Sequence, residues 1–302
     1  MAGSSAGGSM LPPILSWGAA PQSEFRTRGG YCRRMRPVRA VLVDIDGVLT
    51  VSWEPIPGAV AAVEWLREIR MPLALVTNTT SRSRASIAAA LQAGGFPVAG
   101  DDILTAPVIA ASYLRQHYPG ARCLLLNAGD ISPDLAGITI AGPDDREVDV
   151  VLIGGAGPQF SYEALNRAFR HLEAGARLVA MSRGLYWRTA TGLQLDSGAF
   201  VAGLEQAAGT TAEVVGKPAG AFFATALAHL GAEAADALMV GDDIDNDVLA
   251  AQQCGLTGVL VRTGKYSARG HAAAAGSPDH VLDSIAGLPA LLRSLGPASH
   301  DA

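Results

Sequence analysis

Four short segments of the chain carry the residue types that phosphoryl transfer needs, and each segment follows a short apolar run. They are Asp44-Ile45-Asp46-Gly47, Thr77-Asn78, Lys217, and Gly241-Asp242-Asp243 with the nearby Asp247. In an open parallel α/β sheet, functional groups stand just beyond the carboxyl ends of the strands. Two carboxylate clusters, a hydroxyl and a lysine brought together there could hold one phosphate and one divalent cation.

The first segment places two carboxylates at positions i and i+2 of an extended chain, where they face the same side. Two such carboxylates repel each other unless a proton or a cation relieves them. We expect Asp44 to attack phosphorus as the nucleophile, and Asp46 to protonate the leaving oxygen and then to deprotonate the attacking water. The competing interpretation is an ordinary turn after a strand, which an isolated Asp-x-Asp-Gly would favour.

The last segment supplies carboxylates from a second strand end, and Mg²⁺ is the hard, oxygen-seeking ion that suits them. We predict that Mg²⁺ is held by Asp44, by Asp46 through its main-chain carbonyl, and by Asp242. Either Asp243 or Asp247 would support the ion, and the sequence leaves this choice open.

Thr77, Asn78 and Lys217 are the expected ligands of the phosphate. The hydroxyl and main-chain N–H groups of Thr77 and Asn78 suit the phosphate oxygens, although the same pair could simply cap the following helix. Lys217 lies in Val-Val-Gly-Lys-Pro, and it can neutralise the nucleophile and the phosphate as charge shifts. Most lysines instead lie on the solvated surface, and this segment lacks the spacing of a P-loop.

The composition is that of a folded protein and gives no sign of a nucleic-acid or membrane partner. The chain has 302 residues, of which 49% are hydrophobic and 17% charged, and its net charge is −5. This length and apolar content favour two domains. A negative charge without a dense basic stripe argues against nucleic-acid binding, and no apolar run reaches the length of a membrane span. Three distant cysteines without a CxxC motif favour a reducing compartment, so we expect a cytoplasmic protein.

Residues 1–38 differ in composition from the rest of the chain. They are rich in Gly, Ser, Pro and Arg, and Glu24 is their only acidic residue. An Arg-rich, acid-poor leader can be a transit peptide. Met35 lies just before the first predicted strand and is an alternative start of the folded protein. We therefore favour the interpretation that the preceding residues are an extension with no fold of its own.

Apolar runs of strand length alternate with helical patterns, which predicts a doubly wound, parallel α/β sheet. The predicted strands are 40–43, 73–76, 103–104, 123–126, 148–153, 177–181, 214–215, 237–240 and 258–261. The predicted helices are 60–69, 81–91, 108–117, 162–173, 198–208, 222–230 and 248–254. The candidate catalytic residues lie only before position 79 and after position 216. We therefore predict a discontinuous Rossmann-like core domain over 39–105 and 212–296, with an inserted α/β cap domain over 106–211.

Two segments of the predicted cap domain allow more than one interpretation. Tyr186-Trp187-Arg188 could reach down and contact substrate, or it could be the amphipathic edge of a hairpin, and we weigh these equally. Gly154-Gly155-Ala156-Gly157 follows a strand but lacks the G-x-G-x-x-G spacing of a dinucleotide site. The six histidines show no metal-ligand spacing, so we expect surface or helix-end positions for them.

Taken in order, DIDGVL, TNT, GKP and GDDIDND resemble the motifs of the haloacid dehalogenase (HAD) superfamily of aspartate-nucleophile phosphatases. The resemblance runs from about Ala40 to the C-terminal region. The insertion is similar to the large α/β cap of subclass IIA, which includes pyridoxal phosphate, phosphoglycolate, nucleotide and sugar phosphatases. FSYEALNRAF, AEVVGKP, MVGDDIDNDV and VRTGKY are in addition similar to phospholysine phosphohistidine inorganic pyrophosphate phosphatases and related HAD-like hydrolases.

The resemblance implies a phosphoric monoester hydrolase that uses Mg²⁺ and forms dimers through its cap. Its implied substrate is a small phosphorylated compound, either pyrophosphate or a phospholysine or phosphohistidine, with sugar, nucleotide and pyridoxal phosphates as alternatives. The Gly-rich segment from Gly154 to Pro158 departs from relatives, which often carry an acidic residue there. If this loop contacts the substrate, the relatives' substrate preference does not transfer to this chain, whereas the core chemistry is unaffected. Two other functions compete: a dehalogenase, which would need neither Asp46 nor the acidic cluster, and a scaffold that binds a phosphorylated ligand without turnover.

Overall fold

The computed structural model describes residues 37–189 and 192–296. The predicted N-terminal extension therefore lies almost wholly outside the described residues. Val38, at its end, is only 7% exposed and packs into a buried apolar cluster.

The first sheet contains six strands in the order β15-β14-β13-β1-β4-β5, and every neighbouring pair is parallel. The strands are β1 (Ala40–Asp44), β4 (Leu73–Thr77), β5 (Ile103–Thr105), β13 (Ala237–Gly241), β14 (Thr257–Val261) and β15 (His280–Leu282). Both β4 and β13 pair directly with β1. Three of the four predicted polar segments therefore follow three adjacent strands.

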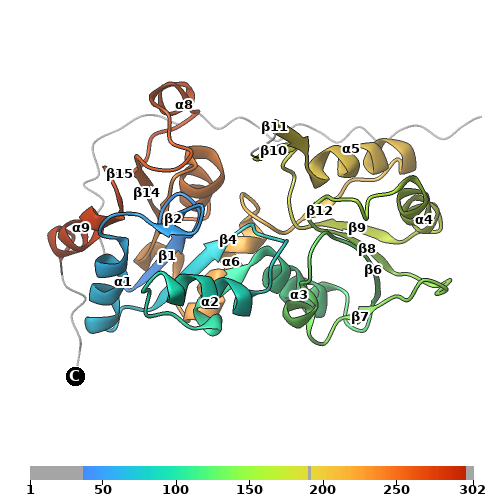
Figure 1. Ribbon diagram of the computed structural model, residues 1–302, viewed down its shortest axis with the longest axis horizontal. Helices are drawn as coiled ribbons and strands as arrows, with labels where there is room; N and C mark the ends of the chain where they lie inside the picture. Colours follow the sequence, from blue (N-terminus) through green and yellow to red (C-terminus); the bar gives the residue numbers. More distant parts are fainter. Residues whose placement is uncertain (1–36, 190–191, 297–302) are drawn as a thin grey trace, which may run out of the picture. The chain divides into compact units, whose positions relative to one another are not determined.

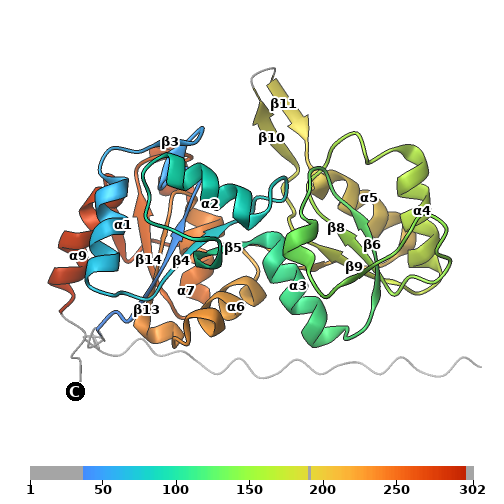
Figure 2. The same ribbon diagram turned by 60° about the horizontal axis from the view of Figure 1, so that its bottom comes forward.

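Both faces of this sheet are buried, which explains why its strands are continuous apolar runs. In β1, Val41 and Val43 pack on one face, and Ala40 and Leu42 pack on the other. The first face is covered by α1 (Ala59–Glu68), α2 (Arg84–Ala93) and α9 (Leu288–Ser294). The second is covered by α3 (Ala106–His117), α6 (Gly220–Leu230) and α7 (Ala250–Gln253). Figure 2 shows these helices around the strands, and the short helix α8 (Ala268–Ala273) follows β14.

The second sheet has the order β12-β9-β8-β6-β7 and is also parallel. Its strands are β6 (Arg122–Leu126), β7 (Thr139–Ile140), β8 (Val150–Ile153), β9 (Arg177–Ala180) and β12 (Glu213–Val214). The helices α4 (Tyr162–Glu173) and α5 (Ser197–Ala208) pack on one face of it (Figure 1). Because β12 pairs with β9, this sheet reaches Val214, beyond the boundary predicted for the inserted domain at position 211.

One buried apolar cluster, here called the seam cluster, is shared by both sheets. It contains side chains from β1, β4 and β13 of the first sheet, from β6, β8 and β9 of the second, and from α3 and α6. Leu42 and Val76 belong to it on one side, and Leu152 and Val179 on the other. The stretch that carries the second sheet is therefore packed against the first sheet through a common core.

Two short hairpins complete the elements that bear on the site. In the first, β2 (Thr50–Val51) pairs with β3 (Glu54–Pro55) through Ser52 and Trp53. Both turn residues have positive φ, at 51° and 69°, which is the backbone of a type I′ turn. The second hairpin joins β10 (Tyr186–Thr189) to β11 (Gly192–Leu195) (Figure 2).

Most predicted elements are present, within a few residues of their predicted bounds. The helix predicted over 248–254 is present but shorter: α7 covers Ala250–Gln253, and a π-helical turn over Ile244–Leu249 precedes it. Short 3₁₀ turns occupy Gly100–Asp102, Ser132–Leu135, Ala234–Asp236 and Ile285–Gly287. None of the helices in the described part of the chain is long and apolar enough to cross a membrane.

Candidate active site

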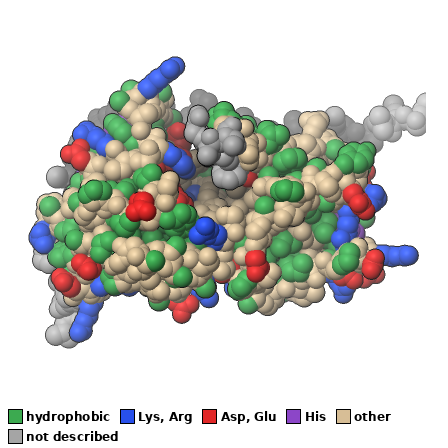
Figure 3. Space-filling model, in the orientation of Figure 1, with side chains coloured by type: hydrophobic (Ala, Val, Ile, Leu, Met, Phe, Trp, Pro, Cys, Tyr) green, Lys and Arg blue, Asp and Glu red, His purple; other side chains and the backbone are tan. Residues whose placement is uncertain are grey.

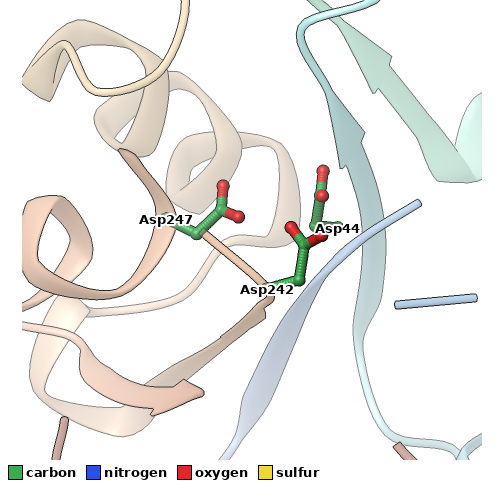
Figure 4. A group of neighbouring side chains, drawn as sticks. All are labelled: Asp44, Asp242 and Asp247. Carbon is green, nitrogen blue, oxygen red and sulfur yellow. The ribbon is translucent and has the colours of Figure 1, made fainter. Parts of the chain in front are cut away.

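Three aspartates converge at the carboxyl ends of β1 and β13. Asp44 is the last residue of β1, Asp242 follows β13, and Asp247 lies in the π-helical turn that comes next. One carboxylate oxygen from each lies within 4.8 Å of the others, and all three residues are buried (Figure 4). The structure thus brings together residues that are about 200 positions apart in the chain.

Lys217 lies between two of these carboxylates and is itself buried. Its Nζ is 2.6 Å from Oδ1 of Asp44 and 2.7 Å from Oδ1 of Asp247. The lysine side chain is 5% exposed, which contradicts the interpretation of Lys217 as a solvated surface residue. Burial alone would lower the pKa of Lys217, but the facing carboxylates of Asp247 and Asp44 raise it. The lysine therefore stays charged.

Burial also governs the acidic side chains. It raises the pKa of Asp44 to about 8, against the lowering effect of Lys217. It raises the pKa of Asp242 to about 6, against the hydrogen bond from the main chain of Lys265. Both shifts arise because a buried carboxylate loses its hydration. A cation placed among these oxygens would favour their charged forms.

The loops after β4 and before α6 are braced together by Asn78. Its Nδ2 donates to the carbonyl of Lys217 at 2.8 Å, and its Oδ1 accepts from the main-chain N–H of Lys217 at 2.9 Å. This reciprocal pair fixes the main chain that carries the lysine. The side chain of Asn78 is therefore engaged in positioning Lys217, and helix α2 is capped instead by Ser83.

Asp46 stands apart from the buried group, in an exposed position. Its Oδ2 lies 3.5 Å from Oγ1 of Thr77 and 3.4 Å from Oγ1 of Thr79. The two hydroxyls are 2.9 Å from each other. An exposed carboxylate beside the cluster is suitably placed to exchange a proton with a bound ligand. Thr79 was missed by the sequence interpretation, although it lies in the same strand-end segment as Thr77.

Asp243 points its side chain elsewhere, which distinguishes it from Asp247. Its carboxylate accepts from the main-chain N–H groups of Asp245 and Asn246, and from Nδ2 of Asn246. Asp243 thus caps the π-helical turn, whereas Asp247 of that turn faces the acidic cluster. Gly241 makes this possible, because a Cβ there would lie 2.2 Å from the Cβ of Asp247.

The predicted substrate contacts in the insertion lie on the second hairpin. Tyr186 and Trp187 both belong to β10, and Tyr186 is 63% exposed. The segment forms one strand of this hairpin, and a hairpin is compatible with both interpretations of it. A contact between these residues and a substrate stays a prediction.

A further segment reaches the acidic cluster from the end of β14. The main-chain N–H of Lys265 donates to Oδ2 of Asp242 at 2.6 Å, and the hydroxyl of Thr263 donates to the carbonyl of Gly47 at 2.5 Å. The sequence interpretation assigned no role to this segment. The sequence could have indicated a role for this segment, because it lies just after the apolar run 257–261, as the other site residues lie just after theirs.

Comparison with known proteins agrees with this geometry. Two family models match, a haloacid dehalogenase-like hydrolase model over residues 41–140 and a HAD-hydrolase-like model over residues 214–288. Haloacid dehalogenase-like hydrolase domain-containing protein 2 of Homo sapiens is 40% identical over 233 residues, covering 77% of this chain and 87% of that protein. Phospholysine phosphohistidine inorganic pyrophosphate phosphatase of Xenopus laevis is 40% identical over 236 residues, covering 76% of this chain and 85% of that protein.

Solved structures share the fold. Glycerol phosphate phosphatase from Mycobacterium tuberculosis, in complex with calcium, superposes with a TM-score of 0.74 at 32% identity. The match covers 83% of this chain and 74% of that one. The family assignment follows from three findings: the fold with its two parallel sheets, the four motifs after strands, and the similarity of these relatives. The chain belongs to the haloacid dehalogenase-like hydrolases and is a phosphatase of that superfamily.

Proposed function

We propose that this chain is a Mg²⁺-dependent phosphatase that hydrolyses a small phosphorylated compound through an aspartyl-phosphate on Asp44. The observation that carries the proposal is the buried arrangement of Asp44, Asp242 and Asp247 around the amine of Lys217. A buried set of three carboxylates with one lysine retains excess negative charge. Such a site suits a divalent cation together with the charge that shifts during phosphoryl transfer.

The residues present fit Mg²⁺. All the donors are hard oxygen atoms, and Oδ1 of Asp242 is buried without a hydrogen-bond partner. A buried polar atom of this kind needs a partner to offset its lost hydration. Asp44, Asp242 and the main-chain carbonyl of Asp46 would hold the ion, with Asp247 in support. When bound, Mg²⁺ supplies positive charge that neutralises the phosphate and the carboxylates.

The first half-reaction transfers the phosphoryl group to the enzyme. A carboxylate oxygen of Asp44 forms a bond to phosphorus as the bond from phosphorus to the leaving oxygen breaks. Asp46, in its protonated form, gives its proton to that leaving oxygen. The hydroxyls of Thr77 and Thr79 lie beside Asp46 and orient its carboxyl group.

The second half-reaction releases inorganic phosphate. Asp46, now ionised, takes a proton from a water molecule whose oxygen attacks phosphorus. The bond between phosphorus and Asp44 breaks, which restores both carboxyl groups. Lys217 remains charged throughout and offsets the negative charge that moves between Asp44 and the phosphate.

The relatives' names suggest which substrates to test first. Phospholysine, phosphohistidine and pyrophosphate come from one relative, and glycerol phosphate comes from a solved structure. Sugar, nucleotide and pyridoxal phosphates are the alternatives. Tyr186 is exposed on the second hairpin and would contact the part of the substrate beyond its phosphate. A homodimer through the insertion stays a prediction.

The test starts from p-nitrophenyl phosphate, with and without Mg²⁺, and continues with a panel of phosphate esters, pyrophosphate and phosphoramidates. Asp44→Asn should abolish turnover, whereas Asp101→Asn removes a carboxylate that is 91% exposed and should leave it unchanged. Acid quench followed by borohydride reduction should convert residue 44 to homoserine if the aspartyl-phosphate forms. Full activity of Asp44→Asn would disprove the assignment of the nucleophile. Binding of phosphorylated ligands without turnover would instead favour a scaffold.

A further inference from the structure

The segment 263–265, which follows β14, contacts both the loop that follows the nucleophile and one of the predicted metal ligands. Its Thr263 hydroxyl donates to the carbonyl of Gly47, and its Lys265 N–H donates to Oδ2 of Asp242. These contacts join parts of the chain that are 216 and 23 positions apart. The segment itself offers no carboxylate to a cation.

The middle residue of the segment, Gly264, lies against the same carboxylate. A Cβ on Gly264 would lie 2.0 Å from Oδ2 of Asp242 and 2.5 Å from the Cα of Gly47. A Cβ on Gly47 would lie 1.9 Å from the same oxygen. Both glycines have positive φ, at 59° and 86°. Two glycine backbones are therefore packed directly on Asp242, where no side chain would fit.

This packing fixes the orientation of the Asp242 carboxylate. Oδ2 is held by the Lys265 N–H and enclosed by the two glycines, while Oδ1 is buried and has no hydrogen-bond partner. Rotation of the carboxylate would bring it against Gly47 or Gly264. Oδ1 is therefore the oxygen that remains for a cation, and its direction is set by the segment 263–265.

We propose that the segment 263–265 positions Asp242 for Mg²⁺ binding and couples that ligand to the loop that follows Asp44. This inference rests on the proposed function, because it takes the Mg²⁺ site as given. Groups that orient a metal ligand without touching the metal commonly change metal affinity when they are replaced. Thr263, Gly264 and Lys265 are thus positioning residues, and Mg²⁺ affinity depends on them.

A pair of glycine substitutions tests the packing. Gly264→Ala introduces a Cβ against Asp242, whereas Gly231→Ala introduces one at the same φ of 59° with nothing within 4 Å. The two variants share the backbone strain and differ in the contact with the carboxylate. Isothermal titration of metal-free protein with MgCl₂ should show a Kd for Gly264→Ala that is raised on the order of 10- to 100-fold. Gly231→Ala should keep the wild-type Kd.

A pair of threonine substitutions tests the hydrogen bond. Thr263→Val removes the bond to Gly47, and Thr263→Ser restores a hydroxyl. Thr225→Val is the matched control, because the Thr225 hydroxyl donates to the carbonyl of Ala221 within α6 at 2.8 Å. We expect Thr263→Val to weaken Mg²⁺ binding roughly tenfold, Thr263→Ser to recover it, and Thr225→Val to leave it unchanged.

The outcomes separate this inference from the proposed function. If the wild-type protein shows no saturable Mg²⁺ binding, the metal-dependent function fails. If the wild-type protein binds Mg²⁺ but Gly264→Ala and Thr263→Val keep its Kd within twofold, the positioning role is overturned. Equal losses in Thr263→Val and Thr225→Val would also overturn it, because they would reflect general destabilisation. Should Gly264→Ala fail to fold, the threonine set decides.

Discussion

Replacing Lys217 with methionine tests whether this buried amine neutralises the acidic cluster. Methionine has a similar length, so the substitution removes the charge while largely filling the space. The lysine amine lies 2.6 Å and 2.7 Å from oxygens of Asp44 and Asp247, whose side chains are 7% and 3% exposed. Without the amine, the metal-free protein must either bury the negative charges of these carboxylates with no opposite charge beside them, or protonate the carboxylates. We therefore expect Lys217→Met to lower both stability and activity.

The size of the effect follows from the burial of all three groups. Removing one partner of a buried ion pair typically costs about 3–5 kcal/mol. For a domain of this size, that corresponds to a drop in Tm of roughly 10 °C. Saturating Mg²⁺ contributes about 2.7 kcal/mol at 100 times its Kd, so it should recover part of the loss. Saturating Mg²⁺ should not restore kcat, which we expect to stay about 10²- to 10³-fold below the wild-type value, as when other preorganised charges are removed.

Thermal unfolding in EDTA and in MgCl₂ measures these effects, with Arg122→Met as the stability control. The Arg122 side chain is 44% exposed and lies 3.2 Å from a carboxylate oxygen of Asp145. An exposed pair of this kind contributes about 1 kcal/mol at most. If Lys217→Met unfolds within about 2 °C of the wild-type protein in EDTA, a change of 1 kcal/mol or less, the lysine does not neutralise this cluster.

Two further predictions concern protons at the same site. Burial raises the pKa of Asp44 to about 8 and that of Asp242 to about 6, so protons compete with Mg²⁺ as pH falls. Lowering the pH from about 8 to about 6 should weaken Mg²⁺ binding roughly tenfold or more, and a Kd that is independent of pH in calorimetry would contradict this. Thr79→Val removes a hydroxyl 3.4 Å from Asp46, so kcat should fall about fivefold with KM unchanged. Steady-state kinetics beside Thr225→Val would measure it, and an unchanged kcat would show that the hydroxyl does not orient Asp46.

The strand ends could be predicted because each carries a simple local pattern. Apolar runs such as 40–43, 73–76 and 237–240 are buried on both faces of a parallel sheet, so the pattern requires no alternation. The polar residues that follow these runs then meet at one edge of the sheet. The resemblance in motif order agrees with this placement of Asp44 and Asp242. It also led to Lys217, which follows β12 of the second sheet.

Other features of the site depend on contacts between distant parts of the chain. The close approach of Gly47 and Gly264 joins positions that are far apart, and neither glycine differs locally from a turn glycine. The choice between Asp243 and Asp247 depends on the π-helical turn over Ile244–Leu249, and the helix predicted from the sequence began only at 248. The hairpin turn at Ser52 and Trp53 was missed because neither residue is typical of positive φ.

The seam cluster limits how new substrate preferences can be acquired by exchanging parts between relatives. A transplanted stretch 106–211 would have to reproduce side chains such as Leu152 and Val179, which belong to the same buried cluster as Leu42 and Val76 of the first sheet. A mismatch that leaves a void the size of a leucine side chain costs about 2–5 kcal/mol. Wholesale chimeras are therefore expected to be unstable unless the interface is transferred with them. Changes confined to exposed side chains outside the seam cluster, such as Tyr186, Leu193 and Leu195 of the second hairpin, avoid this constraint.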